Sequence, residues 1–117
     1  MPQILPLEPS VAFYQFGTTL DQLPCIIDAR WNSRDNAWYL DFFDTEEIPI
    51  AFGVKAILGV HLGRRLTHEI FRQGVLVAAD LSGKGIDATY DDIGQRVELR
   101  YYTNFEVMAT LKQQGLG

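Results

Sequence analysis

The sequence is poor in cysteine, in basic residues and in long apolar stretches, and each shortage excludes a class of protein. Cys25 is the one cysteine among 117 residues, so no disulfide can form within the chain. Lysine and arginine number 10 against 15 aspartates and glutamates, giving a net charge of −5. A surface that follows a phosphate backbone needs concentrated positive charge. We therefore expect no direct contact with nucleic acid, and none with an anionic membrane.

Two further absences concern targeting. The first ten residues, MPQILPLEPS, contain three prolines and no basic residue, which does not fit a secretory signal peptide. No apolar run approaches the roughly 20 residues that a membrane-spanning helix needs. With 47% hydrophobic residues, the chain has the size and composition of one globular domain. We expect a single β-rich domain over residues 1–103, followed over residues 104–117 by a tail or a short docking helix, in a soluble protein of a reducing cytoplasm.

What the sequence does contain is an alternation of apolar and polar residues with a period of two, which predicts antiparallel strands. The expected strands are 11–20, 25–31, 37–43, 48–52, 54–62, 74–81 and 96–102. Glycines inside such runs favour a sharply curved sheet. We predict an all-β fold, a small antiparallel barrel or sandwich of about seven strands, with a short helical turn near residues 90–94.

Two tryptophans flank a polar loop in the stretch RWNSRDNAWYLDFFD, residues 30–44. The alternation predicts that the inward face of this hairpin consists of Trp31, Trp38, Leu40 and Phe42. The aspartates of the stretch are expected to point outward into water.

Two registers of this hairpin bring the apolar faces together. One pairs Asp28 with Asp41, a like-charge pair that destabilises a sheet. The other leaves a four-residue turn from Asn32 to Asp35 and pairs Asp28 with Tyr39. Short turns of this kind suit Asn, Ser and Asp, so we predict the second register.

The polar residues suggest little chemistry. His61 and His68, with Glu69, lack the helical spacing of a typical metal site, and two arginines lie between them. Asp28 and Asp41 are predicted on the outward face, where burial cannot raise the pKa of a catalytic acid. We expect no enzymatic activity, no catalytic residue, no metal and no cofactor. Tryptophan and tyrosine beside Asp and Asn is also the composition of a carbohydrate-stacking site, which remains the alternative.

Motifs along most of the chain resemble a known family. They are L-P-L-E near the start, F-Y-Q-F, R-W-N-S-R-x-x-x-W-Y-L-D-x-x-D, G-V-x-x-x-L-G-V-x-L, G-x-L-V-A-x-D and D-D-I-G-Q-R-V-x-L-x-Y-Y. The most specific are Trp31-Asn32 with the segment 38–41, and the segment 93–97. Together they are similar to the baseplate plug proteins of contractile-tailed phages, of the kind described for a cyanophage baseplate. The resemblance runs from Ile4 to Tyr102.

The resemblance implies a structural virion protein of the tail baseplate, made in the host bacterial cytoplasm, that plugs the space between the central hub and the end of the tail tube. Its partners would be the hub and tube-end proteins, and we expect it to be oligomeric within the assembly. It implies no enzymatic activity and no cofactor. A carbohydrate-binding module that aids attachment to a host surface is the alternative function. Predicted contact residues are the outward aromatics and the exposed arginines: Tyr39, Phe43, Arg64, Arg65, Tyr102 and Phe105.

Overall fold

The computed structural model describes residues 3–20, 22–63 and 74–103. These residues form seven strands and no helix: β1 (Gln3–Ile4), β2 (Phe13–Leu20), β3 (Leu23–Asn32), β4 (Ala37–Phe43), β5 (Pro49–Lys55), β6 (Val75–Asp80) and β7 (Val97–Tyr102). The predicted all-β class is therefore confirmed. The tail 104–117, with its predicted docking helix, lies outside the described residues.

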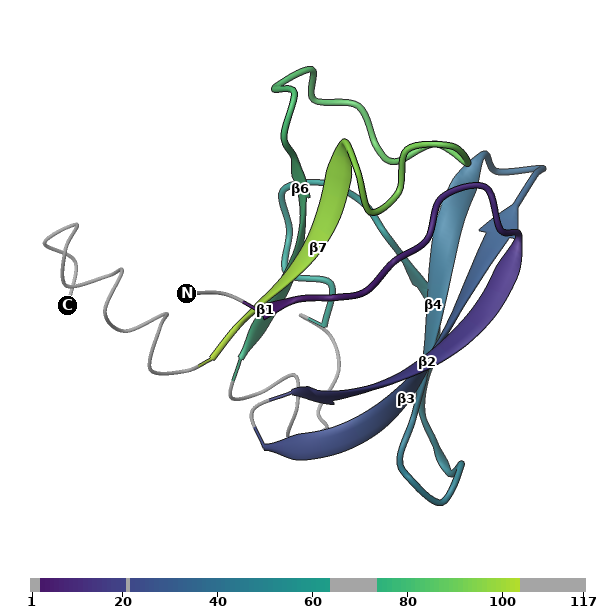
Figure 1. The fold of residues 1–117 in the computed structure, drawn as a ribbon, viewed down its shortest axis with the longest axis vertical. Coiled ribbons are helices and arrows are strands. Elements are labelled where there is room, and N and C mark those ends of the chain that lie inside the picture. Colours follow the sequence, from purple (N-terminus) through teal and green to yellow (C-terminus); the bar gives the residue numbers. More distant parts are fainter. Residues whose placement is uncertain (1–2, 21, 64–73, 104–117) are drawn as a thin grey trace, which may run out of the picture.

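The strands make two antiparallel sheets that face each other (Figure 1). One sheet has the order β2-β3-β4-β5 and the other the order β1-β7-β6. Between β1 and β2 the chain crosses from the second sheet to the first. Because neither set of described strands closes on itself, the architecture is a sandwich and not a barrel.

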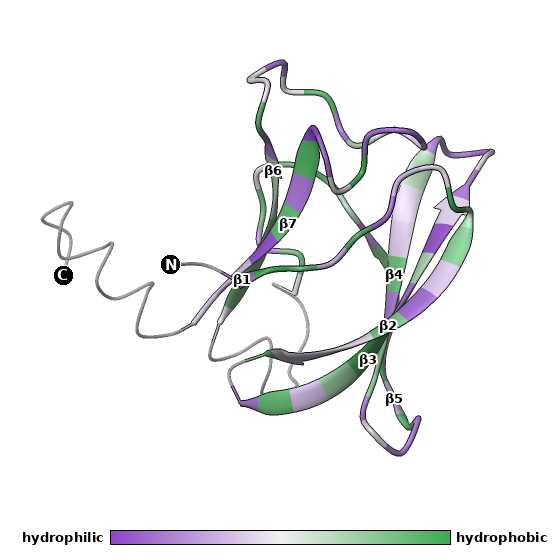
Figure 2. Ribbon diagram, viewed as in Figure 1, coloured by the Kyte–Doolittle hydropathy of each residue, from purple (hydrophilic) through white to green (hydrophobic). Residues whose placement is uncertain are grey.

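The inward residues of the two sheets form one core. In β7, Val97, Leu99 and Tyr101 are buried, and the residues between them are half-buried. Figure 2 shows this alternation as green and purple bands along β7. The same alternation supplies the rest of the core between the sheets, which includes Leu20, Ile27, Leu40, Phe42, Leu76 and Ala78.

An aromatic cluster joins the β3–β4 hairpin to the loop before β7. Trp38 is 1% exposed, and its Nε1–H donates a hydrogen bond of 2.9 Å to the carbonyl of Thr89. Tyr90 packs against Trp38 and against the half-buried Trp31, with ring centroids 6.2 and 5.7 Å away. Both tryptophans therefore lie on the inner face of their sheet, where aromatic contacts add to area burial.

The predicted register of the β3–β4 hairpin is wrong. Asp28 pairs with Asp41 and not with Tyr39, and the two tryptophans stand directly opposite each other. The turn residues are accordingly 33–36 and not 32–35. The Asn32 side chain accepts hydrogen bonds from the backbone N–H groups of residues 34 and 35, at 3.0 and 3.1 Å.

Local donors offset the like-charge cost that argued against this register. Asp28 accepts a hydrogen bond of 2.7 Å from the side chain of Gln15, on the neighbouring strand β2. Asp41 accepts two from Arg30 and one from the backbone N–H of Gly53. Asp41 is moreover only 7% exposed, so the expectation that it points freely into water is also wrong.

Two other predictions need correction. The expected strand 54–62 does not form: β5 continues through Gly53 to Lys55, and the following residues leave the sheet, touching β6 through an isolated bridge at Leu58. The two-residue strand β1 has no recognisable alternation and is not among the predicted strands. Near residues 90–94 there is no helix, but the N–H of Arg96 bonds the carbonyl of Asp92 in a single helix-like turn.

Candidate functional site: the outer face of the four-stranded sheet

The outer face of the sheet β2-β3-β4-β5 consists of three rows of side chains that run across the strands. The strand register defines them, because directly opposite residues point to the same side. The rows are Phe13, Arg30, Tyr39 and Lys55; then Gln15, Asp28 and Asp41; then Gly17, Ile26, Phe43 and Pro49. The residues that alternate with these rows, among them Ile27, Leu40 and Phe42, are buried in the core, so the rows lie on the opposite side of the sheet.

Apolar side chains concentrate at the third row. The ring of Phe52 packs edge-on against Phe43, with centroids 5.5 Å apart and planes at 79°. Phe52 is nevertheless 63% exposed, the largest exposed fraction among the large hydrophobic residues described. Beside this pair is a shallow hollow lined by Gln15, Ile26, Phe43 and Glu47. We call Ile26, Phe43, Phe52 and the exposed Phe13 of the first row the outer-face patch.

A β-bulge in β5 places Phe52 on this side. The pairing of β4 with β5 shifts between Leu40 and Phe42, and Gly53 has a φ of +66°, a conformation that favours glycine. The N–H of Gly53 is held by the carboxylate of Asp41 at 2.8 Å. The bulge is therefore fixed by the same buried acid that sits in the middle of the face.

The centre of the face is an ion pair. Arg30 Nε lies 3.0 Å from Asp41 Oδ2, and its Nη2 lies 3.3 Å from Oδ1. Burial of Asp41 opposes ionisation, but the bonds from Arg30 and Gly53 outweigh it and hold the pKa of Asp41 below its ordinary value. The guanidinium carbon also lies 5.3 Å from the ring centroid of Tyr39.

A second polar group lies at the end of the first row, beside the turn of the β3–β4 hairpin. The Tyr39 hydroxyl donates to the carboxylate of Asp35 at the hairpin tip, and Lys55 Nζ lies 2.9 Å from the same carboxylate. These bonds lower the pKa of Asp35, and the bond to Asp35 raises the pKa of Tyr39. Tyr39 is thus held in place and half-buried.

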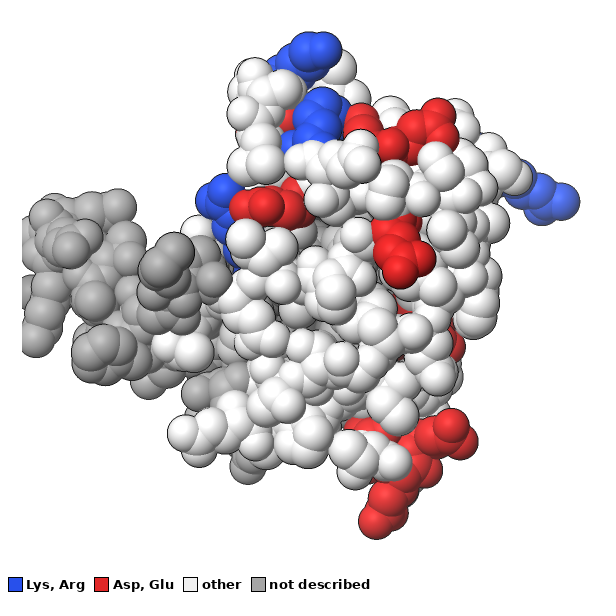
Figure 3. Space-filling view, viewed as in Figure 1, with Lys and Arg blue, Asp and Glu red and all other residues white. Residues whose placement is uncertain are grey.

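The turn between β4 and β5 is strongly acidic. Asp44 accepts backbone hydrogen bonds from Glu46 and Ile48, both at 2.9 Å, which closes the turn. Glu46 and Glu47 are left exposed, and Glu47 lines the hollow beside Phe43. Figure 3 shows this turn as a red projection at the bottom of the molecule. Negative charge therefore borders the outer-face patch.

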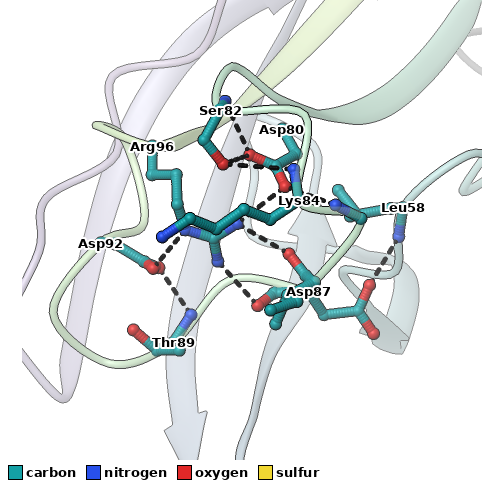
Figure 4. Close-up of polar contacts among 10 residues, drawn as sticks. Leu58, Asp80, Ser82, Lys84, Asp87, Thr89, Asp92 and Arg96 are labelled. Atoms are coloured by element: carbon teal, nitrogen blue, oxygen red, sulfur yellow. Dashed lines mark hydrogen bonds and ion pairs between the residues drawn. The ribbon is translucent and has the colours of Figure 1, made fainter.

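A separate polar network lies in the loop after β6 (Figure 4), at the opposite end of the molecule from the β4–β5 turn (Figure 1). The side chain of Arg96 donates to the backbone carbonyls of Ile86 and Asp87, at 2.9 and 3.0 Å. It also pairs with Asp80 at 2.9 Å and with Asp92 at 2.6 Å. The hydroxyl and N–H of Ser82 and other backbone donors hold the pKa of Asp80 well below its ordinary value.

The described residues offer little for catalysis or ligand chemistry. They contain no group of three or more His, Cys, Asp or Glu side chains arranged to hold a metal ion. Burial raises the pKa of the Cys25 thiol to about 11, whereas a reactive cysteine needs a lowered pKa. The lowered pKa of Asp41 is likewise the opposite of what a catalytic acid needs.

The buried Trp38 indole leaves no face on which a sugar could stack. Within the same residues, no helix has the length and apolar character required to cross a membrane.

The structure brings together two of the predicted contact residues and separates a third. Tyr39 and Phe43 lie on the outer face of β4, on either side of Asp41. Tyr102 lies in the other sheet, half-buried on the outward side of β7. Arg64, Arg65 and Phe105 lie outside the described residues. The predicted hairpin residues Trp38, Leu40 and Phe42 are buried, and Trp31 is half-buried.

Sequence reasoning missed Phe52 and the polar network at Arg96. Phe52 lies next to Gly53, and a glycine inside a strand is the signal of a bulge that turns a neighbour outward. The signal of the network is Asp80, a lone acid at the end of an apolar strand followed by Ser-Gly-Lys-Gly. Neither signal identifies the partner residue. Phe43 contacts Phe52, and Arg96 contacts Asp80, only in the folded chain.

Comparisons with known proteins agree with the resemblance. The family described as "Cyanophage baseplate Pam3 plug gp18" matches residues 2–104 of the 117. A search of curated proteins gave no match. Since the family match covers both sheets, the loop between β6 and β7 and the outer-face patch, the chain belongs to the cyanophage baseplate Pam3 plug gp18 family.

Proposed function

We propose that this chain is a non-enzymatic structural plug of a contractile phage tail, packing between the central hub and the end of the tail tube. The family supports a structural role in the baseplate. We further propose that the outer-face patch is a docking surface for a neighbouring baseplate protein. Tyr39 and Phe43 are retained as contact residues, joined by Phe52.

The observation that carries this proposal is the exposed Phe43–Phe52 pair. Phe52 is 63% exposed although the bulge at Gly53 and the ring of Phe43 fix its position. Burying a phenylalanine side chain contributes about 1.5–3 kcal/mol. A fixed ring loses little conformational entropy on binding, so it is a favourable anchor for an interface.

The acidic border indicates the chemistry of the partner. Glu46 and Glu47 are exposed beside the patch, and Asp28 lies within the face. The arginine and lysine of the first row are already engaged with Asp41 and Asp35. A partner surface with an apolar centre and lysines or arginines around it would complement this face.

Co-expression with the hub and tube-end proteins of the same phage tests the proposal. We expect the wild-type chain to co-purify with at least one of them. Phe52→Ser should weaken that binding by roughly tenfold or more, as at an interface hot spot. Ile4→Ser is the matched control, because Ile4 is 55% exposed but lies in β1 of the other sheet. If the wild-type chain binds neither protein, the proposal fails.

A further inference from the structure

The connection between β6 and β7, residues 81–96, has two halves with different characters. Connections longer than about 12–15 residues without secondary structure are uncommon and usually functional. The second half covers the core: Ala88 and Ile93 are buried, and Tyr90 stacks on Trp38. The first half, residues 81–87, is exposed at every position. Core packing therefore does not explain it.

The side chains of Asp80 and Arg96 nevertheless hold the backbone of residues 81–87 through hydrogen bonds (Figure 4). Asp80 accepts hydrogen bonds from the N–H and hydroxyl of Ser82, at 2.9 and 2.6 Å, and from the N–H of Gly85 at 2.9 Å. Arg96 binds the carbonyls that close the segment, those of Ile86 and Asp87. The side chains of Asp80 and Arg96 are only 5% and 16% exposed. The exposed loop thus rests on a largely buried ion pair.

The loop presents three side chains to solvent. Leu81 and Ile86 are each 56% exposed, and Lys84 lies between them in the sequence. The Lys84 ammonium forms no ion pair with the residues that the structure describes. A Cβ added to Gly83 or Gly85, whose φ angles are +74° and +71°, would meet no other atom within 4 Å. A fixed loop backbone therefore presents two aliphatic side chains and a cation that pairs with no described residue.

We propose that loop 81–87 is a second docking element, which inserts Leu81 and Ile86 into an apolar depression of another baseplate protein while Lys84 meets a carboxylate at its rim. This inference rests on the proposed function. The loop lies at the top of Figures 1 and 3, and the acidic β4–β5 turn lies at the bottom. The chain therefore offers two ends of different chemistry and bridges two different partners, as a plug between hub and tube requires.

Charge favours another protein over a second copy as the occupant. The turn at residues 44–48 of a second copy would offer carboxylates, but each copy has a net charge of −5, so copies repel one another. A different protein that carries a carboxylate beside an apolar depression meets Lys84 without that general repulsion.

The test measures binding of full-length variants to the purified hub protein and to the purified tube-end protein by biolayer interferometry. The loop variants are Lys84→Glu and the double variant Leu81→Ser with Ile86→Ser, and the sheet-face variant is Phe52→Ser. We expect the loop variants to weaken binding to one protein by about tenfold or more, and the sheet-face variant to weaken binding to the other by a similar factor. Ser82→Ala keeps all three exposed side chains but removes a hydroxyl that fixes Asp80. It should weaken the loop's binding by about threefold through lost preorganisation.

The outcomes separate the two proposals. If the wild-type chain binds both proteins and the loop variants bind both equally well, the loop inference is overturned and the proposed function stands. If the wild-type chain binds neither, the proposed function fails and the loop inference with it. Self-association in sedimentation that Lys84→Glu abolishes would make a second copy the occupant and overturn the bridging role. Thermal unfolding at the wild-type temperature confirms that each variant is folded.

Discussion

Trp38 and Tyr90 stack with their ring planes 6° apart and their centroids separated by 6.2 Å. Trp38 belongs to β4 of the four-stranded sheet, and Tyr90 to the connection that leads into β7 of the other sheet. The Trp38 indole also donates to the carbonyl of Thr89, next to Tyr90. This pair therefore ties the two sheets together at the end that carries the β6–β7 loop.

Replacing Trp38 by phenylalanine removes the indole N–H, so the Thr89 carbonyl keeps only the longer hydrogen bond, of 3.4 Å, from the backbone N–H of Asp92. We expect the free energy of unfolding to fall by about 2–3 kcal/mol, from the lost hydrogen bond and the smaller ring. Urea denaturation followed by circular dichroism measures the change. Trp31→Phe is the matched control and should cost less, because Trp31 is only half-buried and its indole has no hydrogen bond to a described residue. Equal losses would show that the hydrogen bond from Trp38 to Thr89 adds no measurable stability.

Asp41 links stability to pH. Its pKa is lowered in the folded chain, so its contribution is present at neutral pH and is lost as the pH falls below about 4 towards the folded pKa. Asp41→Asn should lower the free energy of unfolding by about 1–2 kcal/mol at pH 7. The difference from wild type should shrink at pH 3.

Denaturant titrations at pH 7 and pH 3 check this prediction. Asp28→Asn serves as the control, because the amide oxygen of this variant would still accept the hydrogen bond from Gln15, and Asp28 forms no ion pair with a described residue. A wild-type advantage over Asp41→Asn that grew as the pH fell would contradict the stabilising role of the ion pair with Arg30.

Alanine variants of Gly94 and Gly83 distinguish the cost of a strained backbone from the cost of a steric clash. Both have positive φ, +81° and +74°, but a Cβ on Gly94 would collide with the backbone of Leu7, whereas one on Gly83 would meet open space. Gly94→Ala should therefore destabilise by about 2–4 kcal/mol and Gly83→Ala by about 1 kcal/mol. Melting temperatures of the two variants provide the comparison. Similar losses would mean that Leu7 is not packed tightly on the turn at Gly94.

Cys25 provides a probe of folding. The thiol is 2% exposed and burial raises its pKa to about 11, so it should not react with a chromogenic disulfide reagent at pH 8 while the chain is folded. Reaction should be complete in denaturant. A rapid reaction of the native protein would show that β2 separates from β3 in solution and exposes the thiol.

Local alternation predicted much of the fold. The segments 25–31, 37–43 and 96–102 all lie in strands or extend them by a residue, and Leu99 and Leu40 point inward as their period requires. The all-β class follows from several such runs, whereas the choice between barrel and sandwich required the structure. The two most specific family motifs lie in the β3–β4 hairpin and in the turn that leads into β7.

The register of the β3–β4 hairpin could not be predicted from the hairpin alone, because it depends on contacts with the flanking strands. The prediction for the β3–β4 hairpin register considers two strands alone, in which Asp28 and Asp41 repel. In the folded sheet, Gln15 of β2 and Gly53 of β5 supply donors from either side, and these donors lower the cost of that pair. The bulge at Gly53 likewise joins what looked like two strands into β5. Pairwise rules fail here because the donors belong to the flanking strands β2 and β5, outside the hairpin itself.

A density map of the intact tail tests the central claim most directly. We expect this chain at the centre of the baseplate, between hub and tube end, with the Phe43–Phe52 face buried against one neighbouring protein. A map that places the chain elsewhere in the particle, or leaves the Phe43–Phe52 face open to solvent, would contradict that claim.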